Sequence, residues 1–151
     1  TQIVAEKREA VRTDKGERGN MPLVAHLAEN AMVAGVEFRA GNVSPGARNL
    51  EFIKHCAWQL PKGTRIGHLR ADSAAYQASV FNWCEENEVR FAVGADLDKA
   101  VRGVIEAIPP EQWRPYREGQ IAETVHGMNG TKKAFRLVVV RRPVPGAPPP
   151  R

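Results

Sequence analysis

The first half of the chain alternates between short apolar runs and polar turn signals, a pattern typical of strands joined by tight connections. Residues 21–28 and 32–39 are apolar and are separated by the polar pair Glu29-Asn30, which predicts an antiparallel hairpin. The charged stretch 6–19 before it predicts an exposed connection. Residues 1–5 are short and β-branched, and we expect them to form the end of a strand.

The apolar spacing changes after residue 46 from a strand-like to a helix-like period. In residues 47–60 the apolar side chains recur every three or four positions, which predicts an amphipathic helix. Residues 65–71 then predict a strand, and Asp72 and Ser73 can cap a following helix. The inner face of that second helix is expected to consist of Tyr76, Val80, Phe81 and Cys84.

The order of elements predicts how the central strands pair. Residues 90–95 predict another strand and residues 97–108 another helix, so the middle of the chain runs helix, strand, helix, strand. A helical crossover of this kind joins parallel strands. Together with the antiparallel meander at the head of the chain, it predicts an α/β fold with a mixed sheet and flanking helices.

The character of the sequence changes again beyond residue 108. Residues 113–116 are expected to form a loop, whereas 121–125 and 134–140 predict two strands of a hairpin. Residues 143–151 are rich in proline and basic, which predicts an extended tail. We therefore expect a core over residues 1–108, a β-rich insertion or edge hairpin over 109–142, and a tail over 143–151.

Composition adds a modest preference for polyanions. The 151 residues include 22 Lys and Arg against 17 Asp and Glu, a net charge of +5. Basic side chains attract nucleic acid because each phosphate contact releases condensed counterions. The DNA-contact candidates are Arg8, Arg12 and Lys15, although neighbouring acids also allow a solvated linker. With no apolar run of transmembrane length and no signal-peptide pattern, we expect a cytoplasmic protein.

Conventional catalytic motifs are absent from the sequence, which leaves one acid in a suggestive position. There is no phosphate-binding loop, no dinucleotide fingerprint, no HExxH and no GxSxG. Asp72 follows a predicted central strand, and open α/β sheets place their sites at the carboxyl ends of strands. Its carboxylate could ligate Mg²⁺, and the alternative is that it only caps a helix.

Four phrases of the sequence resemble the DDE catalytic domain of bacterial insertion-sequence transposases. They are EFRAGNVSPGAR at residues 37–48, LRADSAAY at 69–76, NWCEENEVRFAVG at 82–94 and AFRLVVVR at 134–141. The resemblance covers most of residues 1–142 and implies an RNase H-like fold. It also implies that Asp72 is the second acid of an Asp-Asp-Glu set that binds Mg²⁺ or Mn²⁺.

The same resemblance implies that the set is incomplete in this chain. The first Asp would lie just before residue 1, and the Glu would follow the point where the chain stops. Aromatic residues usual in the family are replaced near Asp14 and Asn20. We therefore expect a truncated fragment that is inactive alone, whereas the complete transposase would bind transposon ends and target DNA, perform cleavage and strand transfer, and could form a homodimer.

Two other hypotheses compete with a transposase segment. One is a non-catalytic DNA-binding or interaction remnant of a decayed mobile element, and the other is an unrelated α/β domain without active chemistry. The RNase H-like hypothesis makes two structural predictions: strand 65–71 is central and parallel to strand 90–95, and the Asp72 carboxylate lies near the end of segment 1–5.

Overall fold

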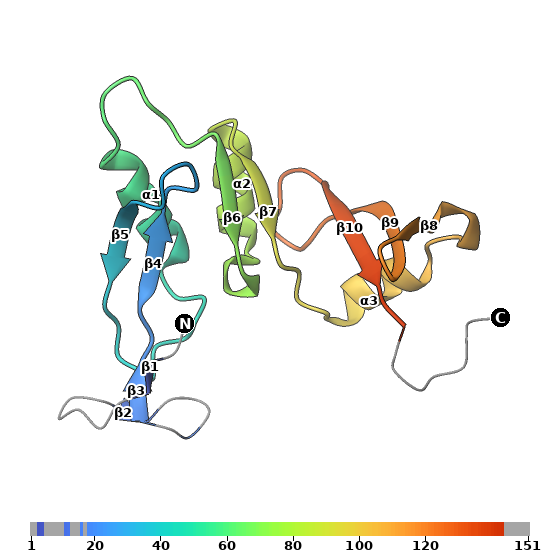
Figure 1. Cartoon of the computed structure of the whole chain (residues 1–151), viewed down its shortest axis with the longest axis horizontal. Coiled ribbons are helices and arrows are strands. Elements are labelled where there is room, and N and C mark those ends of the chain that lie inside the picture. The colour runs from blue at the N-terminus through green and yellow to red at the C-terminus, as the bar shows by residue number, and fades with distance from the viewer. Residues whose placement is uncertain (1–2, 5–10, 13–15, 17, 144–151) are drawn as a thin grey trace. The chain divides into compact units, whose positions relative to one another are not determined.

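The computed structural model of the chain describes residues 3–4, 11–12, 16 and 18–143. The chain divides into two compact units, unit 1 over Thr1–Gly94 and unit 2 over Ala95–Arg151 (Figure 1). Each unit is considered by itself below. Among the described helices, none has the length and apolar character needed to cross a membrane.

Unit 1 begins with two small antiparallel sheets. The first has the strand order β1-β3-β2, and the second is the hairpin of β4 and β5. This hairpin confirms the prediction made for residues 21–39. The bounds of these strands are β1 (Ile3–Val4), β2 (Val11–Arg12), β3 (Arg18–Asn20), β4 (Leu23–His26) and β5 (Val33–Glu37).

The middle of unit 1 is a parallel pair joined by a helical crossover. Strands β6 (His68–Ala71) and β7 (Arg90–Val93) pair in parallel. Between them lie the 3₁₀ turn η1 (Ser73–Ala75) and helix α2 (Ala78–Glu86). The parallel pairing predicted for these two segments is therefore confirmed. The physical reason is the crossover itself, since only a helix-length connection returns the chain to the same end of the sheet.

Helix α1 (Asn49–Trp58) packs on β5 and against α2, which in turn packs on β7. Figure 1 shows both helices behind the strands. The close approach of α1 to β5 depends on Gly35, because a Cβ there would lie 2.7 Å from Sγ of Cys56. The buried residues of α1 are Asn49, Phe52 and Cys56, whereas the apolar positions used to predict the helix, Leu50, Ile53, Ala57 and Leu60, are half-buried.

The core of unit 1 is centred on α2. Val80 and Cys84 are completely buried, and Phe81 stacks on Phe91 of β7 with ring centroids 4.5 Å apart. Three of the four residues predicted to form the inner face of this helix are therefore correct. Tyr76 is the exception, because it ends η1 before α2 begins and meets Phe81 edge to face.

Unit 2 is a three-stranded antiparallel sheet with one helix. The sheet has the order β10-β9-β8, and its central hairpin confirms the strands predicted near 121–125 and 134–140. The prediction of a loop at 113–116 is wrong, because β8 joins the sheet as an edge strand. Pro115 lacks an amide proton, and an edge strand tolerates that loss. The elements are α3 (Lys99–Glu106), η2 (Pro110–Gln112), β8 (Arg114–Tyr116), β9 (Gly119–His126) and β10 (Phe135–Arg141).

Helix α3 belongs to this sheet and not to the preceding α/β segment. It packs against β9, and both Val101 of α3 and Ala122 of β9 are completely buried. The division of the chain therefore falls after Gly94, whereas the sequence-based boundary was placed after Ile108. The cause is the apolar side of α3, which the sheet of unit 2 covers. Of the predicted tail, residues 144–151 lie outside the described residues.

The mixed α/β class is established, with three α-helices and several small sheets in the described part of the chain. The hairpin β4-β5 and the parallel pair β6-β7 are separate hydrogen-bonded pairs there, and β1 bonds to β3. Among the described strands β6 pairs only with β7, so the central position predicted for it is wrong there, and an RNase H-like arrangement remains a prediction.

Candidate functional site

Asp72 stands at the carboxyl end of β6, where the parallel pair ends and η1 begins. Its side chain is exposed, and its Oδ1 accepts a hydrogen bond of 3.1 Å from the backbone N–H of Ala74. Asp72 therefore caps the 3₁₀ turn η1, whereas the predicted helix itself, α2, begins later and has Gln77 at its N-cap. A carboxylate has about four lone-pair sites, so one capping bond leaves acceptor capacity for a cation. The metal-binding role of Asp72 stays a prediction.

The turn after Asp72 is held by two segments that are distant in the sequence. Nδ2 of Asn49 donates to the carbonyl of Ala74 at 2.7 Å, and Nε2 of Gln77 donates to the carbonyl of Gly46 at 2.6 Å. On the other side a Cβ at Gly94 would lie 3.3 Å from the backbone nitrogen of Ser73. The loop before α1 and the residue after β7 therefore both contact the turn that follows Asp72.

Close backbone approaches bring together three of the four phrases identified in the sequence, because a Cβ at Gly46 would lie 3.3 Å from the carbonyl oxygen of Ala74 and one at Gly94 would lie 3.3 Å from the nitrogen of Ser73. Gly46 belongs to the phrase 37–48, Ala74 to the phrase 69–76 and Gly94 to the phrase 82–94. The fourth phrase, 134–141, coincides with β10 in unit 2. The sequence phrases of unit 1 therefore meet at the turn that follows Asp72.

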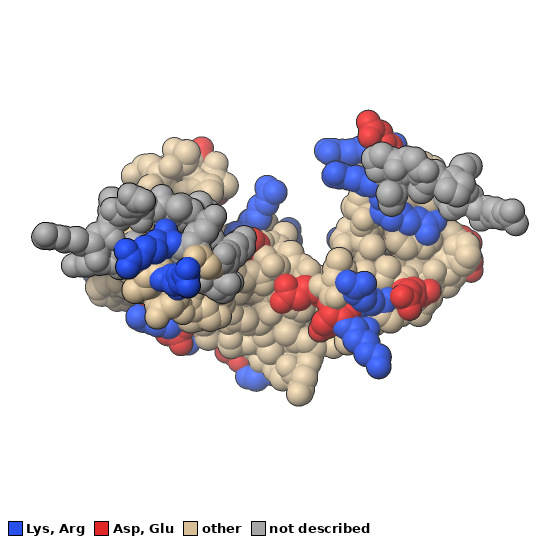
Figure 2. Space-filling view, turned by 90° about the horizontal axis from the view of Figure 1, so that it is seen from below, with Lys and Arg blue, Asp and Glu red and all other residues tan. Residues whose placement is uncertain are grey.

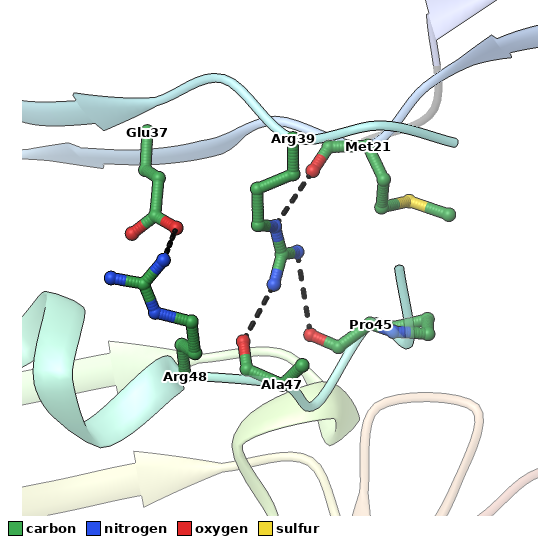
Figure 3. Close-up of polar contacts among 6 residues, drawn as sticks. All are labelled: Met21, Glu37, Arg39, Pro45, Ala47 and Arg48. Carbon is green, nitrogen blue, oxygen red and sulfur yellow. Dashed lines mark hydrogen bonds and ion pairs between the residues drawn. The ribbon is translucent and has the colours of Figure 1, made fainter. Parts of the chain in front are cut away.

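A buried arginine fixes the loop that reaches this turn (Figure 3). Arg39 is only 6% exposed, and its guanidinium donates to the carbonyls of Met21 at 2.9 Å, Ala47 at 2.6 Å and Pro45 at 3.5 Å. The backbone N–H of Met21 donates back to the carbonyl of Arg39 at 3.0 Å. We call this arrangement the Arg39 clasp. Beside it, Arg48 forms an ion pair of 3.2 Å with Glu37.

Among the described residues, no other acids complete a metal centre around Asp72. The described residues contain no group of three or more His, Cys, Asp or Glu side chains placed to hold a metal ion. Asp98, which follows β7, caps α3 by accepting a 2.8 Å hydrogen bond from the N–H of Val101. Asp96 and Asp98 both belong to unit 2. The residues described therefore do not fit a two-metal centre, and Asp72 offers one ligand.

The structure describes two residues of segment 1–5, which was predicted to lie near Asp72. Ile3 and Val4 form β1, which pairs with β3 and lies in a different hydrogen-bonded sheet from β6. The prediction that these two strands are neighbours is therefore wrong for the described residues, because β1 pairs with β3 and β6 pairs with β7. Ala5, at the end of the segment, lies outside the described residues, so its distance to Asp72 remains a prediction.

Of the three DNA-contact candidates, the structure describes one. Arg12 is exposed on β2 and lies directly opposite Arg18 of β3 in the antiparallel register. Arg8 and Lys15 fall outside the described residues. Their role as DNA contacts stays a prediction.

A charged cluster in unit 2 was not identified from the sequence. One carboxylate oxygen of Glu123 on β9 lies 2.6 Å from Nη2 of Arg136 on β10 and 3.4 Å from Nη2 of Arg114 on β8. The hydrogen bond from Arg136 holds the pKa of Glu123 below its ordinary value, and the charges of both arginines act in the same direction. The alternation of residues 121–125 and 136–140 could have indicated a common face, but the contribution of β8 could not be read from a segment expected to be a loop.

Comparisons with known proteins identify no relative of this chain. No protein-family model matches it, and no curated protein or solved structure matches it. Its assignment therefore depends on the residues and geometry described above.

Proposed function

We propose that this chain is a segment of a DNA transposase of the bacterial insertion-sequence type, with Asp72 as one metal-binding carboxylate. The observation that carries the proposal is the exposed position of Asp72 at the end of a parallel strand, where three of the four transposase-like phrases meet. Strand ends of this kind are where open α/β sheets place their chemistry.

The chemistry of transposition explains what one carboxylate can and cannot do. Hydrolysis and strand transfer are in-line displacements at phosphorus, in which two metal ions stabilise the attacking and leaving oxygens. Asp72 alone cannot hold two cations, and Mg²⁺ bound by one carboxylate keeps most of its water. The proposed role of this segment is to position Asp72 for a centre that needs further acids.

The test is metal-dependent nicking of a supercoiled plasmid in Mg²⁺ or Mn²⁺. We expect no cleavage by the 151-residue chain. A longer protein that includes this chain and the two acids implied by the resemblance should cleave, and Asp72→Asn should abolish its activity. Asparagine is as good an N-cap as aspartate, so this substitution keeps the capping bond to Ala74 while it removes the charge.

The matched control in the longer protein is Asp98→Asn, which makes the same change at the cap of α3 and should retain activity. If the short chain nicks DNA and Asp72→Asn abolishes that nicking, other acids complete the centre and the assignment of a partial site is wrong. If Asp72→Asn leaves the longer protein active, Asp72 is only a cap and the proposed role fails.

A second candidate function is a DNA-binding module without catalysis. One observation favours it: the net positive charge is concentrated in unit 2, away from Asp72 in the sequence. Binding without metal-dependent cleavage by the longer protein would support this alternative.

A further inference from the structure

The two units differ in net charge although they contain similar numbers of basic residues. Unit 2 has ten Lys and Arg against six Asp and Glu, which gives +4, whereas unit 1 has twelve against eleven, which gives +1. Nearly all of the net charge of +5 therefore resides in the 57 residues of unit 2. A unit with such an excess attracts polyanions from solution.

The sheet of unit 2 has one covered and one exposed face. Along β9 and β10 the side chains alternate strictly, and Ala122, His126 and Leu137 are buried on the side of α3. The opposite side is here called the outer face. It consists of Arg114 and Tyr116 of β8, Ile121, Glu123 and Val125 of β9, and Arg136, Val138 and Val140 of β10.

The charged residues of the outer face are accessible to a ligand. The side chains of Arg114 and Arg136 are each 67% exposed, and both approach the same oxygen of Glu123. One carboxylate therefore balances one of two guanidinium groups. Arg117, next to Tyr116, lies with its guanidinium 5.4 Å from the centre of that ring and adds a third cation at the β8 end.

The outer face also carries exposed apolar side chains next to these cations. Val125 is 66% exposed, Val138 47% and Val140 44%. Figure 2 shows Lys and Arg side chains on the right-hand part of the molecule with Asp and Glu among them. Basic groups beside apolar ones suit the alternating phosphate and deoxyribose of a DNA strand, because cations bind the phosphates and methyl groups contact the sugars.

We propose that the outer face of the β8-β9-β10 sheet is a binding surface for the phosphate backbone of duplex DNA, with Arg114 and Arg136 as phosphate contacts. Glu123 holds the two guanidinium groups in place and competes with phosphate for them. The proposal deepens the proposed function by naming a DNA-contact surface, and it moves that surface from the N-terminal stretch to unit 2. The affinity of this face for DNA is expected to depend on the charge of the protein and on the salt concentration, and not on the base sequence of the DNA.

The experiment is a fluorescence-anisotropy titration of a labelled 20-base-pair duplex with the 151-residue chain at several NaCl concentrations. Arg136→Gln should weaken binding about three- to tenfold at low salt and reduce the salt slope by about one. Glu123→Gln should strengthen binding by about the same factor, because it removes the competing carboxylate. Opposite effects from the two members of one ion pair distinguish this surface from a general loss of fold.

The matched control is Arg65→Gln in unit 1. Arg65 is also exposed and also paired, with Glu88 at 2.8 Å, so it has the same charge and a similar environment. We expect no change in its DNA affinity beyond the error of the titration. Thermal unfolding of each variant checks that the chain remains folded.

Several results would overturn the proposal. They are equal weakening by Arg65→Gln and Arg136→Gln, weaker binding by Glu123→Gln, preferential binding to phosphatidylserine-containing vesicles, and a dimer of this chain that Arg136→Gln dissociates. Each of them leaves the cleavage test at Asp72 unaffected, so the failure of this surface and the failure of the proposed function are separate outcomes.

Discussion

Arg39 in unit 1 and Arg136 in unit 2 show how burial determines what the same side chain does. Arg39 is 6% exposed and donates only to backbone carbonyls, so its charge holds a loop in place. The side chain of Arg136 is 67% exposed and shares a carboxylate with Arg114. Arg39 is thus a structural element of unit 1, whereas Arg136 of unit 2 presents its charge to solvent. The charge total alone does not distinguish the two uses.

The largest expected effect tests whether the interior of unit 1 is closed. Its two cysteines are the only ones in the chain, and both are buried. Burial, with a smaller contribution from the charge of Glu85, raises the pKa of Cys84 to about 11 from 9.0. Burial also raises the pKa of Cys56. Alkylation of Cys84 at pH 8 should be slowed about a hundredfold relative to the unfolded chain by the lower thiolate fraction alone.

Mass spectrometry after iodoacetamide treatment, in buffer and in concentrated urea, measures this difference. The pH dependence of the alkylation rate gives a second check. The rate at Cys84 in the native chain should rise about tenfold per pH unit up to about pH 11, whereas the rate in the unfolded chain should level off above about pH 9. Equal labelling of native and unfolded chains at pH 8 would mean that unit 1 is open, and its contrast with unit 2 would be lost.

The next effect tests the structural use of a buried cation. Arg39→Met keeps much of the length of the side chain but leaves the carbonyls of Met21, Ala47 and Pro45 without this donor. We expect a loss of about 3 kcal/mol in the free energy of unfolding, measured by urea denaturation.

Arg48→Met is the matched control, since the exposed side chain of Arg48 lies beside the Arg39 clasp and pairs with the half-buried Glu37. Exposed pairs contribute little, and a loss below about 1 kcal/mol is expected. Similar losses for the two variants would show that burial of Arg39 has no special role.

The smallest effect asks whether the two units unfold separately. Val80 in unit 1 and Val101 in unit 2 are both completely buried, so substitution by alanine removes the same two methyl groups from each core. Each substitution should lower the free energy of unfolding of its unit by about 2 kcal/mol. Hydrogen exchange followed by mass spectrometry should show faster exchange only in the peptides of the substituted unit. Faster exchange in both units after either change would indicate one cooperative body.

Local elements were predictable where the sequence pattern depends on a single face. The hairpin of β4 and β5, the parallel pair β6 and β7, and the hairpin of β9 and β10 all follow from period and chain order. Asp72 was also placed correctly at the end of its strand with a capping role. These features require only neighbours in the sequence or the geometry of a crossover.

The features that were missed depend on contacts between distant segments. The apolar residues of α1 occupy a wide part of the helix surface, so their spacing does not show which of them are buried most deeply. That depends on Gly35 of β5, which leaves space for Cys56. Strand β8 contains Pro115, and proline is unfavourable in most strands. The segment could therefore be recognised as a strand only from its pairing with β9. Arg39 resembles any other arginine in the sequence, because its carbonyl partners are backbone atoms.

The Arg39 clasp also has a consequence for the order in which unit 1 assembles. Its guanidinium joins residue 21 to residues 45 and 47, so it can form only after the β4-β5 hairpin has brought residue 21 beside residue 39 and the next loop has folded back. Interactions that form after the folding transition state change the unfolding rate and leave the folding rate nearly constant. We therefore expect the Arg39 clasp to slow the unfolding of the loop beside Asp72 and to leave the rate at which the hairpin forms nearly unchanged.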